Sequence, residues 1–305
     1  MLDSENISEC QKRFSLSYHL TFANHCEQLI GFKGKDVLEV GGSLPKEFVL
    51  EWLNVKSWSA IETPEYDKAF TDLVVSGGEE FDLQATIAKI EKQKKLGFKN
   101  RKFDQYNFFL GEIENLPEEH YQKYDLIFSI AAFEHIHKFP QALEKMFLAL
   151  KPGGKLFSMF CPIWSAHDGH HIPTIVDNNG ISIERGAANC IIPAWGHLLM
   201  RPAEMCKHLY QHTDKNTADL LTYYIYSASH INRYFLEDYL QFIKQSSFKV
   251  DRIDHIYPVQ ARESQIKHLQ VLYPGRKDFL SNGLMIILSK PSTTGDFSLE
   301  NVQLF

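Results

Sequence analysis

The stretch DVLEVGGS, residues 36–43, decides the fold. Its first five residues form a short, mostly apolar run between Gly34 and a pair of glycines, which predicts a buried strand. After the glycine pair, Ser43 is suited to cap a helix and Pro45 fits its first turn. The stretch therefore predicts a strand, a glycine turn and a helix, which is the opening unit of an α/β fold.

Short apolar runs alternate with amphipathic stretches along the rest of the chain. Strands are predicted at 58–62, 107–110, 124–129, 155–160, 248–256 and 284–288, and helices at 16–31, 85–95, 234–246 and 262–273. A further helix carries Leu143, Met146, Phe147 and Leu150 on one face, and the run KPGG at 151–154 predicts its end and a tight turn into the fifth strand. Strands that are nearly all apolar and alternate with helices predict a parallel sheet covered on both faces.

The alternation lapses between residues 162 and 232, a segment rich in His, Pro, Trp and Tyr. We therefore expect one α/β domain, made of residues 1–161 and 233–305. A cap at 162–232 is expected to be inserted after the fifth strand and to bind the acceptor.

Composition narrows the class of protein. The chain has 305 residues and a net charge of -6, and its basic residues are dispersed, so it has no electrostatic footprint for nucleic acid or an anionic membrane. No run of about 18 apolar residues and no signal-peptide pattern occurs. The five cysteines are odd in number and form no Cys-x-x-Cys, which argues against a disulfide framework and a thiolate zinc site. We expect a cytoplasmic protein.

Acidic residues and glycines stand where the first three predicted strands end. In an open parallel sheet, ligands bind beyond the carboxyl ends of the strands. Gly41 and Gly42 would let a ligand approach the backbone, although a plain tight turn would use the same glycines. Glu62 ends the second strand, where a carboxylate can accept hydrogen bonds from both hydroxyls of a ribose; a solvent-exposed strand end is the alternative. Glu112 follows the third strand, where it could read an adenine edge.

Sequence motifs further along the chain resemble a known family. The run from Tyr124 to Leu156, with FEHI at 133–136 and LKPGG at 150–154, closely resembles the type 11 group of class I S-adenosylmethionine-dependent methyltransferases. So does the Gly-x-x-x-x-Leu-Pro pattern at 111–117. The chain departs from the family where Ser43 and Pro45 replace later glycines of the first motif, and in the long connection between the second and third strands.

The resemblance implies a fold, a cofactor and a set of contacts. The fold is a Rossmann-like doubly wound sheet, mostly parallel with an antiparallel last strand. The cofactor is S-adenosylmethionine, whose methyl group passes directly to the acceptor atom. The residues implied in cofactor binding are Glu39, Gly41, Gly42, Glu62, Glu112, Ile113 and Ser129.

Histidines near two strand ends are the candidates for catalysis. His135 follows the fourth strand, a position that faces the methyl group in this fold. His170 and His171 follow the fifth strand at the start of the cap. Histidine titrates near neutral pH, which suits removal of a proton from a hydroxyl acceptor. A capping or packing role is the alternative for His135, and a loop-structuring role is the alternative for the histidines at 167–171. Metal binding is a further reading of that cluster, but we expect no metal, because histidines on one loop fix no ligand geometry.

These features together predict a methyltransferase that acts on a small-molecule acceptor, most plausibly a hydroxyl of a sugar or metabolite. A catalytically silent S-adenosylmethionine-binding module would share the fold and the cofactor site. A nicotinamide-dependent oxidoreductase would share the acidic residue of the second strand, but the turn GGSLPK at 41–46 does not supply its Gly-x-Gly-x-x-Gly. No nucleic-acid or membrane partner is expected.

Overall fold

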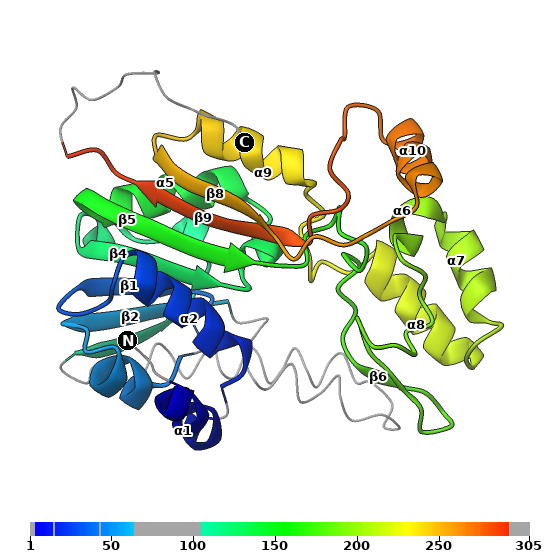
Figure 1. The fold of residues 1–305 in the computed structure, drawn as a ribbon, viewed down its shortest axis with the longest axis horizontal. Helices are drawn as coiled ribbons and strands as arrows, with labels where there is room; N and C mark the ends of the chain where they lie inside the picture. Colours follow the sequence, from blue (N-terminus) through cyan, green and yellow to red (C-terminus); the bar gives the residue numbers. More distant parts are fainter. Residues whose placement is uncertain (1–3, 15, 43, 64–104, 293–305) are drawn as a thin grey trace.

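A seven-stranded sheet forms the centre of the molecule (Figure 1). The computed structural model describes residues 4–14, 16–42, 44–63 and 105–292. The strand order is β3-β2-β1-β4-β5-β9-β8. The first five strands in that order pair in parallel, and β9 is antiparallel to both of its neighbours, as the predicted fold class requires. The strands are β1 (Asp36–Val40), β2 (Ser57–Glu62), β3 (Tyr106–Leu110), β4 (Tyr124–Ile130), β5 (Leu150–Phe160), β8 (Lys249–Ile256) and β9 (Gly283–Ser289).

Alternate side chains of the strands fill two separate cores, because successive residues of a strand point to opposite faces. On β4, Ile127 packs with α5 (Phe139–Ala149) and α9 (Leu236–Gln245). Its neighbours Leu126 and Phe128 pack on the other face with α1 (Ser4–Phe14) and α2 (Tyr18–Leu29). Both faces are therefore covered, as the nearly continuous apolar strands predict.

Two local features differ from expectation. The helix expected after the glycine turn is present but short: residues 46 and 47 are α-helical and lead into a π-helical turn, η1 (Phe48–Trp52), which the Leu53 N–H closes on the Phe48 carbonyl at 3.2 Å. The run at 151–154 is a bulge within β5 instead of a turn before it, since the pairing with β4 jumps from Leu150 to Lys155. Pro152 lacks the N–H that a regular ladder needs, and Gly153 has a φ of +80°, so the segment leaves the ladder. The helix predicted at 85–95 lies outside the described residues.

Residues 162–232 form small elements of their own, beside the sheet in Figure 1. They are the hairpin β6 (Ile175–Val176) and β7 (Ser182–Ile183), and the helices α6 (Gly196–Leu199), α7 (Pro202–Leu209) and α8 (Lys215–Tyr226). Helix α10 (Glu263–Leu272) lies on the same side, because Leu269 and Phe279 pack against Trp164 and Trp195. The boundaries of the inserted cap stay a prediction.

Two short 3-10 turns, η3 (Ile113–Asn115) and η4 (Glu118–His120), lie between β3 and β4, and a third, η5 (Phe133–His135), leads from β4 to α5. Within the described part of the chain, none of the helices has both the length and the apolar character needed to cross a membrane.

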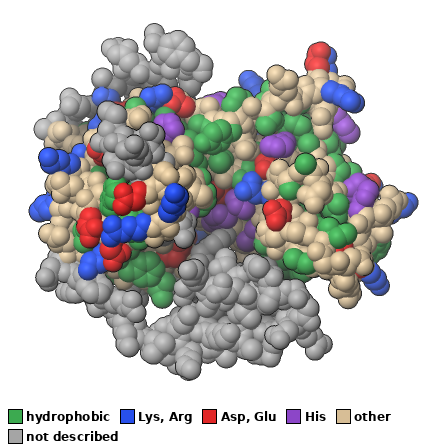
Figure 2. All heavy atoms as spheres, turned by 60° about the horizontal axis from the view of Figure 1, so that its bottom comes forward, with side chains coloured by type: hydrophobic (Ala, Val, Ile, Leu, Met, Phe, Trp, Pro, Cys, Tyr) green, Lys and Arg blue, Asp and Glu red, His purple; other side chains and the backbone are tan. Residues whose placement is uncertain are grey.

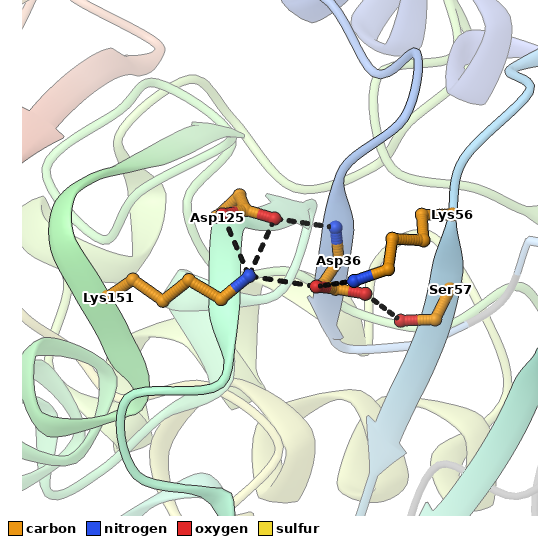
Figure 3. A network of polar contacts seen from close by, with 5 residues as sticks. All are labelled: Asp36, Lys56, Ser57, Asp125 and Lys151. Carbon is orange, nitrogen blue, oxygen red and sulfur yellow. Dashed lines mark hydrogen bonds and ion pairs between the residues drawn. The ribbon is translucent and has the colours of Figure 1, made fainter.

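A polar network ties the strands together at their amino ends (Figure 3). The Asp36 carboxylate accepts hydrogen bonds from Lys151 Nζ at 2.8 Å, Lys56 Nζ at 2.9 Å and Ser57 Oγ at 2.7 Å. Lys151 also bonds Asp125, which in turn accepts from the Asp36 N–H at 2.9 Å. Burial raises the pKa of Asp36, but the hydrogen bonds from Lys151, Lys56 and Ser57 outweigh it and lower the pKa to about 2. The network stands at the opposite ends of the strands from the candidate site.

Candidate functional site

A cavity of about 810 Å³ opens at the carboxyl ends of the parallel strands. Its walls are the segments that follow β1 to β5, together with residues from α2, from the loop after β7 and from α8. Figure 2 shows His side chains gathered in the hollow between the two parts of the molecule. The histidines that line the cavity are His135, His137, His171 and His230. This position matches the rule that open α/β sheets bind ligands beyond their strand ends.

Gly41 fits its place because a side chain there would collide with the neighbouring strand end. Its φ is +80°, and a Cβ atom would lie 2.4 Å from the Cβ of Ala132, just after β4. The N–H groups of Gly41 and Gly42 both donate to the Ile61 carbonyl, at 3.0 and 3.1 Å. Gly41 lines the cavity, whereas Gly42 lies against Ala60 and does not. The turn thus brings backbone to the cavity wall between β1 and β4. These two strands are neighbours in the sheet, although β2 and β3 separate them in the sequence.

Glu39 supports this turn from behind and is not part of the cavity wall. Its side chain is fully buried, and its carboxylate accepts hydrogen bonds from the Leu44 N–H at 3.2 Å and from Trp58 Nε1 at 2.9 Å. These contacts fix the loop after β1, and a contact of Glu39 with the cofactor stays a prediction. Ser43 lies outside the described residues.

The other carboxylates expected at strand ends do reach the cavity. Glu62 lines it at the end of β2 and accepts a hydrogen bond from the Thr63 N–H at 2.7 Å. Glu112 and Ile113 line it after β3, with Ile113 buried and Glu112 exposed. Ser129 does not line it; its hydroxyl donates to the Val40 carbonyl at 2.9 Å and so links β4 to β1. Their roles toward a cofactor stay predictions.

Glu134, His135 and His171 meet in the wall that follows β4 and β5. The rings of His135 and His171 have centroids 4.8 Å apart, with an angle of 69° between their planes. Burial raises the pKa of Glu134 to about 8 and lowers the pKa of His135 to about 4. Burial likewise lowers the pKa of His171 well below its ordinary value. Burial therefore disfavours the charged form of each of the three side chains.

His170 lies outside this group. Its side chain is buried within the loop, where Nδ1 accepts from the Ile172 N–H at 3.4 Å and the ring packs edge-on against His197. His197 Nε2 in turn donates to the Trp164 carbonyl at 2.8 Å. These contacts fit the loop-structuring alternative for His170, and its catalytic role stays a prediction.

Two residues important to the cavity were not predicted from the sequence. Arg185, in the loop after β7, lines the cavity and pairs with Asp168 at 2.9 Å. Asn232 is buried behind the cavity, and its Nδ2 donates to the carbonyls of Phe133 and Ile136 at 2.8 and 3.0 Å. Because these partners lie more than 90 positions away from Asn232 in the chain, no local sequence pattern could have pointed to them.

A family model described as a methyltransferase domain matches residues 81–183. The match confirms the resemblance to methyltransferases that the motifs predict, and S-adenosylmethionine is the cofactor of this class. The curated proteins include no significant match to the chain.

Solved structures with a similar arrangement include an S-adenosylmethionine-dependent methyltransferase from Mesorhizobium loti. It shares 10% identity, with 90% of this chain and 99% of that chain covered and a TM-score of 0.43. The YcgJ protein from Bacillus subtilis shares 11% identity, with 90% and 99% covered and a TM-score of 0.41.

Proposed function

We propose that this chain is a methyltransferase that transfers a methyl group from S-adenosylmethionine to a hydroxyl of a small-molecule acceptor. The observation that carries the proposal is a single cavity with two chemically different parts. Glu62 ends β2 and Gly41 and Glu112 follow β1 and β3, whereas Glu134 and His171 follow β4 and β5. Because β1 lies between β2 and β4 in the sheet, the two groups occupy opposite halves of one cavity.

The half at β1 to β3 suits the adenosine and amino-acid parts of the cofactor. The Gly41 turn offers backbone without a side chain, which a ligand can approach closely. Carboxylates at Glu62 and Glu112 provide acceptors for ribose hydroxyls and polar groups of the base. When bound, the cofactor supplies a methyl group on a positively charged sulfur.

The half at β4 and β5 suits a hydroxyl acceptor. His135 and His171 are neutral imidazoles, since burial depresses the pKa of both, and a neutral imidazole nitrogen can accept a hydrogen bond from a hydroxyl. The attacking oxygen would form a bond to the methyl carbon while the sulfur–carbon bond breaks, and the hydroxyl proton would pass to an acceptor in this wall. Holding both reactants in line is worth up to about 7–11 kcal/mol in well-oriented systems.

The size of the cavity favours a small acceptor. A volume of about 810 Å³, shared with the cofactor, falls in the range of about 300–1,000 Å³ that is typical of small-molecule sites. Side chains from the segment at 162–232, among them Arg185 and Tyr224, form part of its wall. This wall supports a metabolite-sized acceptor over a polymer.

The test uses S-adenosylmethionine with a tritiated methyl group and an extract separated into small molecules, protein and RNA. We expect label in the small-molecule fraction, in a product heavier by one methyl group. His135→Gln should reduce the rate by about 100-fold or more, because a positioned proton acceptor contributes ~10²–10⁴-fold. His268→Gln, an exposed change in α10, should leave the rate unchanged. Label only in protein or RNA, or equal rates for both variants, would contradict the proposal.

A further inference from the structure

Glu134, His135 and His171 form a compact cluster of potential metal ligands. One atom from each, a carboxylate oxygen and two ring nitrogens, lies within 4.8 Å of the others. Glu134 and His135 belong to η5 after β4, and His171 belongs to the loop after β5. All three line the cavity. Two neighbouring strand ends thus bring one carboxylate and two imidazoles to one point.

The Glu134 carboxyl lacks the contacts that a buried acid requires. Its side chain is fully buried, and no hydrogen bond of normal geometry reaches either oxygen from the described residues. The backbone N–H groups of Glu134 and Cys161 and the Arg185 guanidinium favour its ionised form without completing such a bond. A buried carboxyl without partners is costly, and such groups call for an explanation such as a bound ion.

The hydrogen bond of the His135 ring matches that of a metal ligand. His135 Nδ1 donates to the His230 carbonyl, which places the lone pair of the ring on Nε2. A ligating histidine usually donates its other nitrogen to a carbonyl or carboxylate in this way. His230 Nε2 donates to the His171 carbonyl at 2.9 Å, which secures the second loop.

Two further features of His171 are those of a functional position. Its Nδ1 is buried and has no hydrogen-bond partner among the described residues. Its backbone has a φ of +51°, a left-handed conformation that is uncommon outside glycine and concentrates at functional positions.

We propose that Glu134, His135 and His171 bind a divalent first-row transition-metal cation in the acceptor half of the cavity. Two imidazoles and one carboxylate suit Mn²⁺, Fe²⁺, Co²⁺ or Zn²⁺, and three protein ligands leave positions open, as in catalytic sites. Ligand atoms about 2.0–2.2 Å from one ion lie roughly 3.0–3.5 Å apart, so binding draws the cluster together by about 1 Å. The Arg185 charge nearby is already paired with Asp168 at 2.9 Å.

The cation would act on the acceptor. Because its three ligand residues line the cavity, the cation would be accessible to the oxygen of a hydroxyl acceptor and would lower the pKa of that hydroxyl. With the cation bound, His135 and His171 would serve as its ligands in place of accepting the hydroxyl proton, which would pass from the bound hydroxyl to water and leave an anionic oxygen. This role rests on the proposed function, whereas binding of the cation itself does not.

The test is a titration of the purified full chain with Mn²⁺, followed by electron paramagnetic resonance. The signal of free aqueous Mn²⁺ should fall by one equivalent per chain. Glu134→Gln and His171→Asn should each weaken binding by about tenfold or more. Asn tolerates the left-handed backbone of residue 171, so His171→Asn is expected to fold. It therefore still tests the site if Glu134→Gln does not fold. His268→Gln, exposed on α10, is the matched control and should bind like the wild type.

Calorimetry with S-adenosylhomocysteine on the same samples separates the two claims. Variants that bind this ligand normally are folded at the site. If the wild type binds S-adenosylhomocysteine but no Mn²⁺, or if Mn²⁺ binds equally to Glu134→Gln and His171→Asn, the cation site is overturned while the proposed function stands. Mn²⁺ binding that depends on these residues, without S-adenosylhomocysteine binding, would support the cation site and count against the proposed function.

Discussion

At the scale of single residues, neighbours decide what each group at a strand end can do. Glu39 and Glu62 both belong to strand ends in the sequence, yet only Glu62 lines the cavity. Trp58 and the loop after β1 occupy the Glu39 carboxylate, which turns it into a support. The glycine turn could be predicted from the sequence, because glycines stand on both sides of a short apolar run. The sequence could not show which carboxylate is occupied by hydrogen bonds within the protein, since this depends on the Trp58 side chain of the neighbouring strand.

The first prediction concerns Gly41. Gly41→Ala places a Cβ atom 2.4 Å from the Ala132 Cβ in a left-handed backbone, so we expect a loss of about 2–5 kcal/mol in the free energy of unfolding. Gly34→Ala is the matched control, because its φ is +72° and nothing lies within 4 Å of the added atom. It should lose only about 1–2 kcal/mol. Urea unfolding measures both, and equal losses would show that the β1 and β4 ends are not in close contact.

The second prediction concerns Glu62. Glu62→Ala should weaken binding of S-adenosylhomocysteine by at least roughly 1 kcal/mol, because it removes the acceptor for the ribose hydroxyls. Glu118→Ala removes an exposed carboxylate outside the cavity wall and serves as the control for net charge. Calorimetry gives both affinities. An unchanged affinity for Glu62→Ala would place the ribose elsewhere.

At the scale of elements, the 3-10 turn η5 depends on a residue that is distant in sequence. Asn232 Nδ2 donates to the carbonyls of Phe133 and Ile136, and its N–H donates to the Glu134 carbonyl at 2.9 Å. Tyr239, on α9, donates its hydroxyl to Asn232 Oδ1 at 2.9 Å. The segment before α9 thereby fixes the turn that presents Glu134 and His135 to the cavity.

The third prediction follows from this clamp. Asn232→Ala leaves two buried carbonyls and the Tyr239 hydroxyl without partners, so we expect a loss of about 2–4 kcal/mol in the free energy of unfolding. Tyr239→Phe removes one hydrogen bond and keeps both carbonyl contacts of Asn232, so it should cost about 1 kcal/mol. Thermal or urea unfolding compares them. A smaller loss for Asn232→Ala than for Tyr239→Phe would contradict the clamp.

Much of the element order could be predicted, because each strand is a short apolar run of its own. The strand predicted at 124–129 is Tyr124–Ile130 in the structure, and the helix predicted at 262–273 is Glu263–Leu272. The bulge at 151–154 could not be predicted in the same way. Pro152 and Gly153 suit a turn and a bulge equally well, and only pairing with β4 and β9 decides between them.

At the scale of the whole molecule, the two ends of the strands differ in what they carry. The amino ends of the strands carry the ion pairs around Asp36 (Figure 3), and the carboxyl ends carry the cavity. The candidate site combines Glu134, His171 and Arg185, which no single motif contains. Their meeting depends on strand order and on the path of residues 162–232, so the sequence could name candidates but could not group them.

The fourth prediction tests the polar network at the amino ends of the strands. The pKa of Asp36 is about 2 in the folded chain, below its ordinary value near 4, so the unfolded chain binds the proton more tightly. The stability that this carboxylate contributes is present above about pH 4 and is lost as the pH falls to about 2. Urea unfolding across this range should show a steeper loss for the wild type than for Asp36→Asn. Parallel pH profiles would show that the network does not depress the pKa.

The most direct test of the whole account is calorimetric titration of the purified chain with S-adenosylhomocysteine. The account predicts saturable binding at one site per chain, because the cavity offers the turn at Gly41 and the carboxylate of Glu62 together. An absence of saturable heat up to about 1 mM ligand, which corresponds to a binding free energy weaker than about 4 kcal/mol, would contradict it.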